Sequence, residues 1–262
     1  MATRNAKLTV ENLSKTFTTS SGVALPVLEN INVEIHSGEF VCIVGTSGCG
    51  KTTFIRILDG LTQPTVGRIT SDKGILNQPG PDRGFVFQQD SLLPWRTVLD
   101  NVLFGLEVQK RPRSESVAVA RDLIDLVGLR GHENHYPHEL SGGMRQRVNL
   151  ARALAIDPEI LLMDEPFAAL DAQTREVMQR ELLRIWETKR KTVIFITHQI
   201  DEAVYLADRV LAFAARPGRI EDELIIPFER PRKLAIKRTP EFVGYTQRIW
   251  ELIHAGQNTT EA

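Results

Sequence analysis

The chain has 262 residues, of which 42% are hydrophobic and 25% are charged, and its formal net charge is −1. This length suits one large domain or a domain with an inserted subdomain, and the charge argues against a general nucleic-acid binder, which usually carries a basic excess. The two cysteines, Cys42 and Cys49, fit neither a disulfide framework nor a metal site and favour a reducing cytosolic compartment.

The N-terminal residues carry no signal-peptide pattern. Met1–Lys7 leads directly into an alternation of apolar and polar residues at Leu8, Val10 and Leu13, without the apolar core that a secretory signal requires. No stretch of the sequence approaches the roughly 20 apolar residues that cross a bilayer. We therefore expect a soluble protein that reaches a membrane only through a partner.

The first third of the sequence predicts strands and one helix. Lys7–Leu13 and Val27–Ile35 alternate apolar and polar residues, as half-buried strands do. Phe40–Val44 is an unbroken apolar run, which is typical of a strand covered on both faces. A glycine-rich loop and a helix over Lys51–Leu61 follow, and the Gly- and Pro-rich stretch Thr62–Gly84 predicts turns between short strands.

One more strand is expected at Phe85–Phe87. From about Pro94 to Ile156 the sequence then predicts mainly helices. Apolar residues recur at helical spacing in three segments: Val98–Val108, Ser114–Val127 and Gly142–Ala155. Beyond them, strands and helices alternate. The strands are expected at Ile160–Met163, Thr192–Thr197 and Arg209–Phe213, and the helices at Asp171–Lys189, Asp201–Leu206 and, in a tail that begins with basic residues, Pro240–His254. The alternation predicts βαβ units and a parallel sheet.

A phosphate-binding pattern lies between the buried strand and the first helix. Gly-Thr-Ser-Gly-Cys-Gly-Lys-Thr fits G-x-x-x-x-G-K-[ST]. Glycines let backbone N–H groups turn inward around phosphates, and the helix N-terminus adds positive potential. We expect Lys51 to reach the β- and γ-phosphates, Thr52 to hold Mg²⁺ and Cys49 to contribute its backbone N–H. The candidate nucleotide-binding residues here are Gly45, Thr46, Ser47, Gly48, Cys49, Gly50, Lys51, Thr52 and Thr53.

Two carboxylates follow the apolar strand that ends at Met163. Asp164 stands at the strand's C-terminal end, where a P-loop site places a Mg²⁺-holding group. Glu165 leaves the strand in another direction and is suited to polarise an attacking water as a general base. An acidic strand end alone is more often a solvated turn or a helix cap. The phosphate loop favours the functional interpretation.

The third predicted helix opens with Leu-Ser-Gly-Gly-Met-Arg-Gln-Arg at Leu140–Arg147. Ser141, Gly142 and Gly143 at a helix N-terminus form a second phosphate-binding surface, although Ser-Gly-Gly alone is a common turn. One molecule with one nucleotide site has no obvious need for this surface, whereas a dimer has. The pattern therefore indicates a nucleotide shared between two chains.

Taken in this order, the patterns resemble those of the ATP-binding subunit of ABC transporters, over essentially the whole chain. Gly45–Thr52 matches the family's Walker A loop, Ile160–Glu165 its Walker B strand with the catalytic glutamate, and Leu140–Met144 its signature motif. Further matches are Gln88 of the Q-loop, Ala169-Leu170-Asp171 of the D-loop, His198 as the switch histidine and Phe17 as the aromatic residue that stacks on adenine.

The resemblance implies an α/β fold with a P-loop NTPase core of the RecA type, an antiparallel β subdomain and an inserted helical subdomain. In this scheme residues 1–95 and 156–230 form the nucleotide-binding core, residues 96–155 the helical signature subdomain, and residues 231–262 a C-terminal helical extension. It also implies a head-to-tail dimer, of two copies or of one copy and a paralogue, with two ATP molecules between the subunits.

The resemblance also assigns roles to the site residues. Glu165, His198 and Gln88 would be catalytic, Thr52, Gln88 and Asp164 would bind Mg²⁺, and Phe17, Ser141, Gly142, Gly143 and Asp171 would complete the ATP site beside the phosphate loop. Gln88 would also link the site to a transmembrane partner. Taken alone, a loop glutamine is usually solvated, a histidine after a strand is often structural, and Phe17 or Trp95 could simply belong to the core.

Three positions depart from the family's usual residues. Met144 replaces the glutamine that closes the signature, so that a side-chain hydrogen bond to the partner's nucleotide is lost. Gln199 stands where an aspartate is common, and Ala168 where a serine is common. None of these changes removes a group that hydrolysis requires, and we expect an active site.

Within the family, the segments after Gln88 and His198 resemble the importer branch for nitrate, sulfonates and taurine. We therefore expect a peripheral protein on the cytoplasmic face of a membrane that energises import of a small anionic solute through permease subunits, served indirectly by an external solute-binding protein, and that binds no nucleic acid. Trp95 lies where the family docks its permease.

Two other classes of protein share parts of this pattern. An ABC-type ATPase acting on DNA or ribosomes would carry either a long coiled coil inside the helical region or two cassettes in tandem. The 95 residues from Gly45 to Leu140 leave no room for a long coiled coil, and the sequence contains one cassette. A metabolic P-loop kinase would not need the signature, Asp171 and His198 together.

Overall fold

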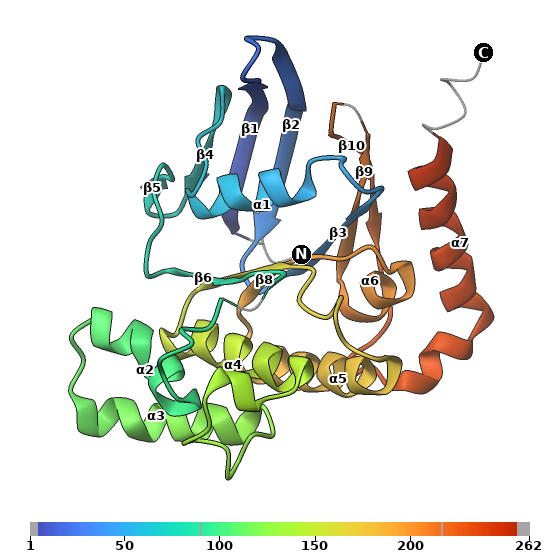
Figure 1. Cartoon of the computed structure of the whole chain (residues 1–262). Helices are drawn as coiled ribbons and strands as arrows, with labels where there is room; N and C mark the ends of the chain where they lie inside the picture. Colours follow the sequence, from blue (N-terminus) through green and yellow to red (C-terminus); the bar gives the residue numbers. More distant parts are fainter. Residues whose placement is uncertain (1–4, 90, 216, 256–262) are drawn as a thin grey trace. The chain divides into compact units, whose positions relative to one another are not determined.

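The computed structural model describes residues 5–89, 91–215 and 217–255, which divide into two compact units. Unit 1 comprises Met1–Gly80 and Arg190–Ala262, and unit 2 comprises Pro81–Lys189. Figure 1 labels most of the strands and all of the α-helices, and its colours follow the sequence. The phosphate loop belongs to unit 1 and the signature segment to unit 2.

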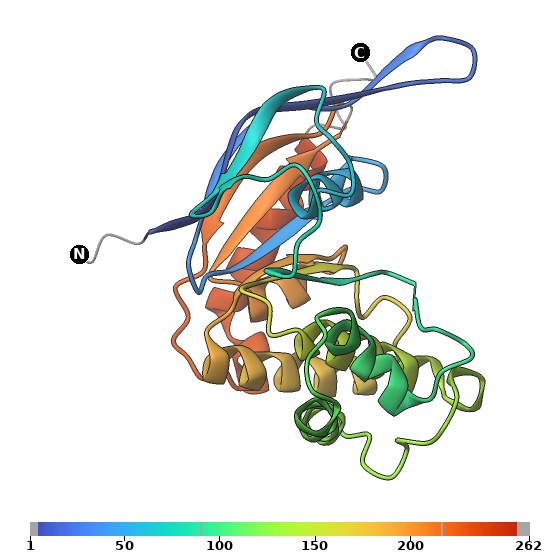
Figure 2. The same cartoon turned by 90° about the vertical axis from the view of Figure 1, so that its left-hand side faces the viewer.

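Unit 1 contains an antiparallel sheet with the strand order β2-β1-β4-β5. Its strands are β1 (Ala6–Thr18), β2 (Ala24–His36), β4 (Val66–Ser71) and β5 (Gly74–Ile75). The β1–β2 pair is a long hairpin (Figure 2). On β1, Leu8 and Val10 are buried, whereas the residues directly after each of them are partly exposed, as the alternation in the sequence predicted.

The second set of strands in unit 1 has the order β10-β9-β3-β8. These strands are β3 (Phe40–Gly45), β8 (Thr192–Ile196), β9 (Arg209–Ala214) and β10 (Arg219–Ile225). β3 pairs in parallel with both β8 and β9, and β10 closes the edge antiparallel to β9. Every residue of β3 and β8 is buried, which explains their continuous apolar sequences.

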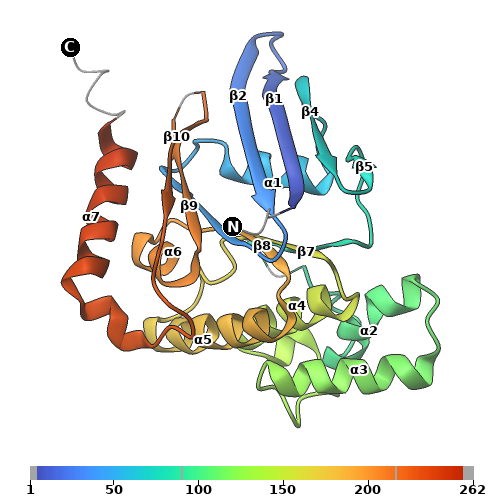
Figure 3. The same ribbon diagram turned by 180° about the vertical axis from the view of Figure 1, so that it is seen from behind.

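Unit 1 also contains helical elements in addition to its strands. They are α1 (Lys51–Asp59), α6 (Ile200–Leu206), the 3₁₀ helix η2 (Leu234–Arg238) and α7 (Pro240–Ala255). Helix α7 packs against α6, β9 and η2 (Figure 3). Helix α1 ends earlier than the predicted Leu61, because Gly60 takes a left-handed φ of 87° and caps it through an N–H bond to the Ile57 carbonyl.

Unit 2 contains a parallel pair of strands and a group of helices. β6 (Arg83–Val86) pairs with β7 (Ile160–Asp164), and the helical elements are α2 (Val98–Val108), α3 (Arg113–Leu126), η1 (Pro137–Glu139), α4 (Gly142–Ala155) and α5 (Ala172–Lys189). Helices α2, α3 and α4 pack against one another.

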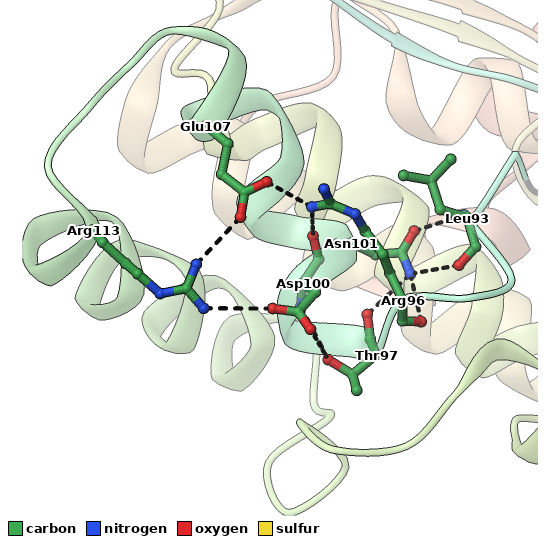
Figure 4. A network of polar contacts seen from close by, with 7 residues as sticks. All are labelled: Leu93, Arg96, Thr97, Asp100, Asn101, Glu107 and Arg113. Atoms are coloured by element: carbon green, nitrogen blue, oxygen red, sulfur yellow. Dashed lines mark hydrogen bonds and ion pairs between the residues drawn. The ribbon is translucent and has the colours of Figure 1, made fainter.

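The start of α2 is fixed by the buried amide of Asn101 (Figure 4). Its Oδ1 accepts from the Leu93 N–H at 2.8 Å, and its Nδ2 donates to the carbonyls of Leu93, Arg96 and Thr97 at 2.9–3.2 Å. The side chain of Asn101 thus supplies hydrogen-bond partners to backbone groups of the preceding loop, which lies outside the helices and strands. The loop presents Trp95 with 71% of its surface exposed, so the interpretation of Trp95 as a core residue was wrong.

Among the described residues, no helix is both long enough and apolar enough to cross a membrane.

Candidate functional site

The phosphate loop follows the fully buried strand β3 and opens helix α1. Gly48 and Gly50 have φ values of 77° and 94°, a region that residues with a Cβ rarely adopt. Space also requires glycine here. A Cβ on Gly45 would lie 2.6 Å from the Phe213 carbonyl oxygen, and one on Gly50 would lie 2.6 Å from Leu28 Cδ2. The chain can therefore make this turn only with glycine at these positions.

Lys51 is held inside the loop that precedes it. Its Nζ donates to the carbonyls of Gly45 and Thr46, both at 2.9 Å, and lies 3.7 Å from Cys49 Sγ. The side chain is buried, so the loop concentrates positive charge beside its own backbone amides. The Cys49 N–H donates to the Thr46 carbonyl at 3.4 Å, a weak bond that a stronger acceptor can replace.

A glycine outside the motif packs directly against the backbone of the loop. A Cβ on Gly218 would lie only 2.0 Å from the Cys49 carbonyl oxygen. Gly218 also donates its N–H to Val27 O at 2.8 Å and accepts from Glu29 N–H at 2.9 Å. No sequence pattern points to Gly218, because it lies more than 160 residues after the loop and belongs to no motif of its own.

Two further predicted site residues belong to the same unit. Phe17 lies on β1 with 41% of its surface exposed, and Lys15 Nζ lies 4.7 Å from the centre of its ring. The ring is therefore not part of the core, and its exposed face suits stacking. His198 is exposed and lies between the buried Thr197 and helix α6, where Gln199 N–H donates to Thr197 Oγ1 at 3.0 Å.

Unit 2 brings Gln88 and the two acidic residues to the ends of its strands. Asp164 is buried at the end of β7, and Glu165 follows with a left-handed φ of 47°. Such a conformation is uncommon outside glycine and is often found at functional sites. Gln88, just beyond β6, donates from Nε2 to Glu165 Oε2 at 3.3 Å. The structure thus joins the predicted Q-loop glutamine to the predicted general base.

Three polar side chains of α4 hold the segment around Gln88. Gln146 and Asn149 donate to the Phe87 carbonyl at 3.3 and 3.5 Å, and Arg152 donates to the Ser91 carbonyl at 2.7 Å and to its Oγ at 2.5 Å. Their spacing of three residues places them along one face of the helix. This role was not predicted, although polar residues within an apolar helical pattern are a signal for it.

The signature segment caps helix α4. Ser141 is its N-cap and accepts from the Met144 N–H at 3.3 Å, with Gly142 and Gly143 in the first turn. A cavity of about 520 Å³ opens beside it, lined by residues of unit 2 between positions 128 and 174. They include Ser141, Gly142, Gly143, Met144, His132 and Asp171.

Asp171 lies at the N-terminus of α5, on the same cavity. Its Oδ1 accepts from the Thr174 N–H at 3.0 Å, and hydrogen bonds from Thr174 lower the pKa of its carboxyl. The cavity thus combines a helix N-terminus without acidic residues in its first turn with the D-loop carboxylate. Gln88, Asp164 and Glu165 do not line it.

Comparison with known proteins agrees with these features. The sequence model of the ABC transporter family matches residues 28–168. The uncharacterized ABC transporter ATP-binding protein MJ0412 of Methanocaldococcus jannaschii is 53% identical over 94% of this chain and 91% of its own. The nitrate import ATP-binding protein NrtD of Synechocystis is 46% identical over 97% of both chains. The taurine import ATP-binding protein TauB of Pseudomonas syringae is 48% identical over 89% of this chain and 92% of its own.

Solved structures lead to the same family. The ATP-binding cassette MJ0796, described as a dimeric post-hydrolysis state bound to ADP and Pi, is 34% identical and superposes with a TM-score of 0.77, covering 85% of this chain and all of that one. The predicted P-loop fold and the predicted family are confirmed. The chain belongs to the ABC transporter family, and it is an ATP-hydrolysing cassette of that family.

Proposed function

We propose that this chain is the ATP-hydrolysing subunit that energises import of a small anionic solute of the nitrate, sulfonate or taurine type through a partner permease. The observation that carries the proposal is the cavity of unit 2 beside Ser141–Met144, where the N-terminus of α4 and the Asp171 carboxylate offer a second surface for phosphates. The relatives named for nitrate and taurine import, at 46% and 48% identity, support the solute class.

The residues of the phosphate loop fit a nucleoside triphosphate. Gly48 and Gly50 hold the backbone in left-handed conformations that turn N–H groups inward, and Lys51 lies within the loop. In this role Lys51 contacts the β- and γ-phosphates, the residues from Gly45 to Thr53 surround them, and Phe17 stacks on the base. Bound ATP supplies the cleavable phosphoanhydride bond.

The proposed metal ligands also fit Mg²⁺. Thr52, Gln88 and Asp164 offer a hydroxyl, an amide carbonyl and a carboxylate, all oxygen donors of the kind that Mg²⁺ prefers. The described residues contain no cluster of three His, Cys, Asp or Glu that could hold a metal alone, and Mg²⁺ in nucleotide sites takes few protein ligands beside the phosphates. Mg²⁺ supplies charge neutralisation at the phosphates.

Two side chains act on the attacking water. Glu165 accepts its proton, and the 3.3 Å bond from Gln88 Nε2 orients the carboxylate for that step. His198, exposed between β8 and α6, contacts the γ-phosphate and holds the water in line. Both residues follow buried strands closely, Glu165 after β7 and His198 after β8.

The active form is a head-to-tail dimer of two copies, or of one copy with a paralogue. The signature cavity then receives the phosphates bound by the partner's loop, where Ser141, Gly142 and Gly143 donate from a helix N-terminus and Asp171 completes the contact. The dimeric cassette MJ0796 supports this arrangement. Met144 has no side-chain amide that could add a hydrogen bond to the bound nucleotide.

The partner on the membrane side is a permease on its cytoplasmic face, with an external solute-binding protein acting indirectly. Trp95 is exposed on the loop that Asn101 fixes, directly after the Gln88 segment. An exposed tryptophan on a rigid loop is a favourable anchor for a protein partner. No nucleic acid is part of this function.

The experiment that tests the proposal is copurification of membrane subunits with the tagged chain, followed by reconstitution and ATPase assays with nitrate, taurine and an alkanesulfonate. We expect a permease to copurify and one of these solutes, with its binding protein, to stimulate hydrolysis. Copurification with DNA or ribosomes, and stimulation by them instead, would support an ABC-type ATPase outside transport. A Trp95→Ala variant should lose the permease, whereas Trp250→Ala, also exposed, should retain it.

A further inference from the structure

Two arginines of the segment 226–238, which we call the C-terminal strap, bind the carbonyl oxygens at the end of helix α6. The last four carbonyls of a helix have no partner within it. Arg232 Nη1 donates to the carbonyls of Val204, Tyr205 and Ala207 at 3.2, 2.9 and 2.7 Å. Arg230 Nη2 donates to the Leu206 carbonyl at 2.7 Å. The strap therefore supplies the cap that the sequence of α6 itself lacks.

The Arg232 side chain is held in this position by burial and by further hydrogen bonds. Only 7% of its surface is exposed, and its Nη2 also donates to the carbonyls of Ile226 and Phe228 at 3.3 and 3.4 Å. Burial, with a smaller effect from Arg230, lowers its pKa to about 10, so it stays protonated at neutral pH. Several carbonyls at different angles need the planar fork of a guanidinium, which a lysine cannot reproduce.

The strap also binds the other end of α6. Lys237, on η2, lies 3.3 Å from Asp201 Oδ2, and Asp201 belongs to the first turn of the helix. Lys237 Nζ also lies 5.0 Å from the centre of the Tyr205 ring. The Tyr205 hydroxyl in turn donates to the Arg232 carbonyl at 3.2 Å. Both ends of one short helix are thus held by the same strap.

The helix that the strap holds begins two residues after His198. α6 has seven residues, too few for a helix that is stable by itself in water. On the N-terminal side of His198, the backbone is held because the buried Thr197 donates its N–H to the Ile43 carbonyl of β3 at 3.2 Å. The remaining freedom of the His198 backbone therefore depends on its C-terminal side, where α6 begins.

From these contacts we propose that the C-terminal strap positions His198 for hydrolysis, with Arg232 and Lys237 as positioning residues that act through α6. The proposal rests on the role proposed above for His198. It assigns to the tail a direct effect on the catalytic step, through a carbonyl-bound arginine at one end of α6 and an ion pair at the other.

The test compares Lys237→Met and Arg232→Lys with Lys233→Met, each in the full chain. Lys233 is exposed on the same strap, so its substitution removes the same charge without touching α6. Lys237→Met removes the ion pair to Asp201 and the charge beside the Tyr205 ring but keeps an apolar chain of similar length, so the proposal stays testable if Arg232→Lys fails to fold. We expect both variants to lower kcat, by on the order of tenfold or more, with KM for ATP unchanged. Lys233→Met should match the wild type.

A double-mutant cycle separates positioning from a general loss of stability. In the His198→Ala background, measured by single-turnover hydrolysis, Lys237→Met should cause no further loss, because both changes remove the same interaction. An additive loss, a change in KM alone, or variants that hydrolyse like Lys233→Met would overturn the strap proposal. A His198→Ala variant with the wild-type rate would instead refute the proposed role of His198.

Discussion

Gln88 Nε2 donates a hydrogen bond of 3.3 Å to Glu165 Oε2. The two residues are far apart in the sequence but each follows one strand of the β6–β7 pair, whose parallel register brings Val86 opposite Met163. The contact has a direct consequence. Movement of the Gln88 segment, which α4 holds through Gln146, Asn149 and Arg152, changes the environment of Glu165, the proposed general base.

Substitution of Glu165 by Gln keeps the shape of the side chain but removes its basicity. We expect ATP binding to be retained and hydrolysis to fall by about 10²–10⁴-fold, the usual contribution of a general base. Phosphate release measures the rate, and size-exclusion chromatography with ATP should detect accumulated dimer. Glu176→Gln, exposed on α5, is the control and should behave as the wild type. Hydrolysis by Glu165→Gln at the wild-type rate would exclude Glu165 as the base.

A mixture of Lys51→Ala and Ser141→Arg should recover activity that neither variant has alone. Lys51→Ala removes the loop's ammonium group, and Ser141→Arg blocks the signature cavity while leaving nucleotide binding by the monomer intact. If the site is shared between chains, each mixed dimer contains one intact combination of loop and signature. Equal mixing should restore about a quarter of the wild-type sites.

Steady-state ATPase assays of the mixture, with heterodimers verified by differently tagged chains, measure this recovery. A second mixture, of Ser141→Arg with Ser141→Arg carrying another tag, is the control and should stay inactive. Verified heterodimers without activity would contradict a site composed from two chains.

Gly218→Ala should impair nucleotide binding although Gly218 lies outside every nucleotide motif. Its new methyl group would meet the Cys49 carbonyl oxygen at 2.0 Å, a distance that forces the phosphate loop to move. We expect weaker ATP binding and a smaller nucleotide-dependent rise in Tm. Gly244→Ala, on α7 with open space around it, is the matched control and should be neutral or slightly stabilising. Equal ATP affinities in both variants would contradict the supporting role of Gly218.

Asn101→Ala should destabilise unit 2 and loosen the loop that carries Trp95. The buried amide makes four hydrogen bonds to backbone groups of Leu93, Arg96 and Thr97, and their loss leaves those groups unsatisfied. We expect the free energy of unfolding to fall by about 2–3 kcal/mol, measured by urea denaturation. Asn134→Ala, at an exposed position, should change it by less than about 0.5 kcal/mol. Equal effects would mean that the network in Figure 4 contributes little.

The sequence predicted best those elements whose ends are encoded locally. Val98–Val108 and Gly142–Ala155 were predicted with the observed bounds, because Thr97 and Ser141 are N-cap residues that precede regular apolar spacing. The buried strands β3, β7 and β8 were also located to within one residue, since unbroken apolar runs between turns leave little freedom.

Features that depend on distant parts of the chain were not predicted. β10 was missed because Arg-Ile-Glu-Asp-Glu-Leu-Ile is highly charged and mostly exposed, and the strand forms by pairing with β9 at the sheet edge. The motif residues were named, but the bond from Gln88 to Glu165 depends on strand register. The arginines that cap α6 were noted only as basic residues of the tail, since no local pattern links them to a helix about 25 residues earlier.

The contact between Gly218 and the phosphate loop limits how this cassette can be copied or redesigned. A library built by varying only the eight residues Gly45–Thr52, or a graft of those residues onto another scaffold, would leave out the backbone surface against which Cys49 rests. A functional transfer would need, besides the loop itself, the part of β2 around Val27, whose carbonyl accepts from Gly218 N–H, and the turn at Gly218. Nucleotide binding in this chain is therefore a property of three separated segments, and engineers should transfer them together.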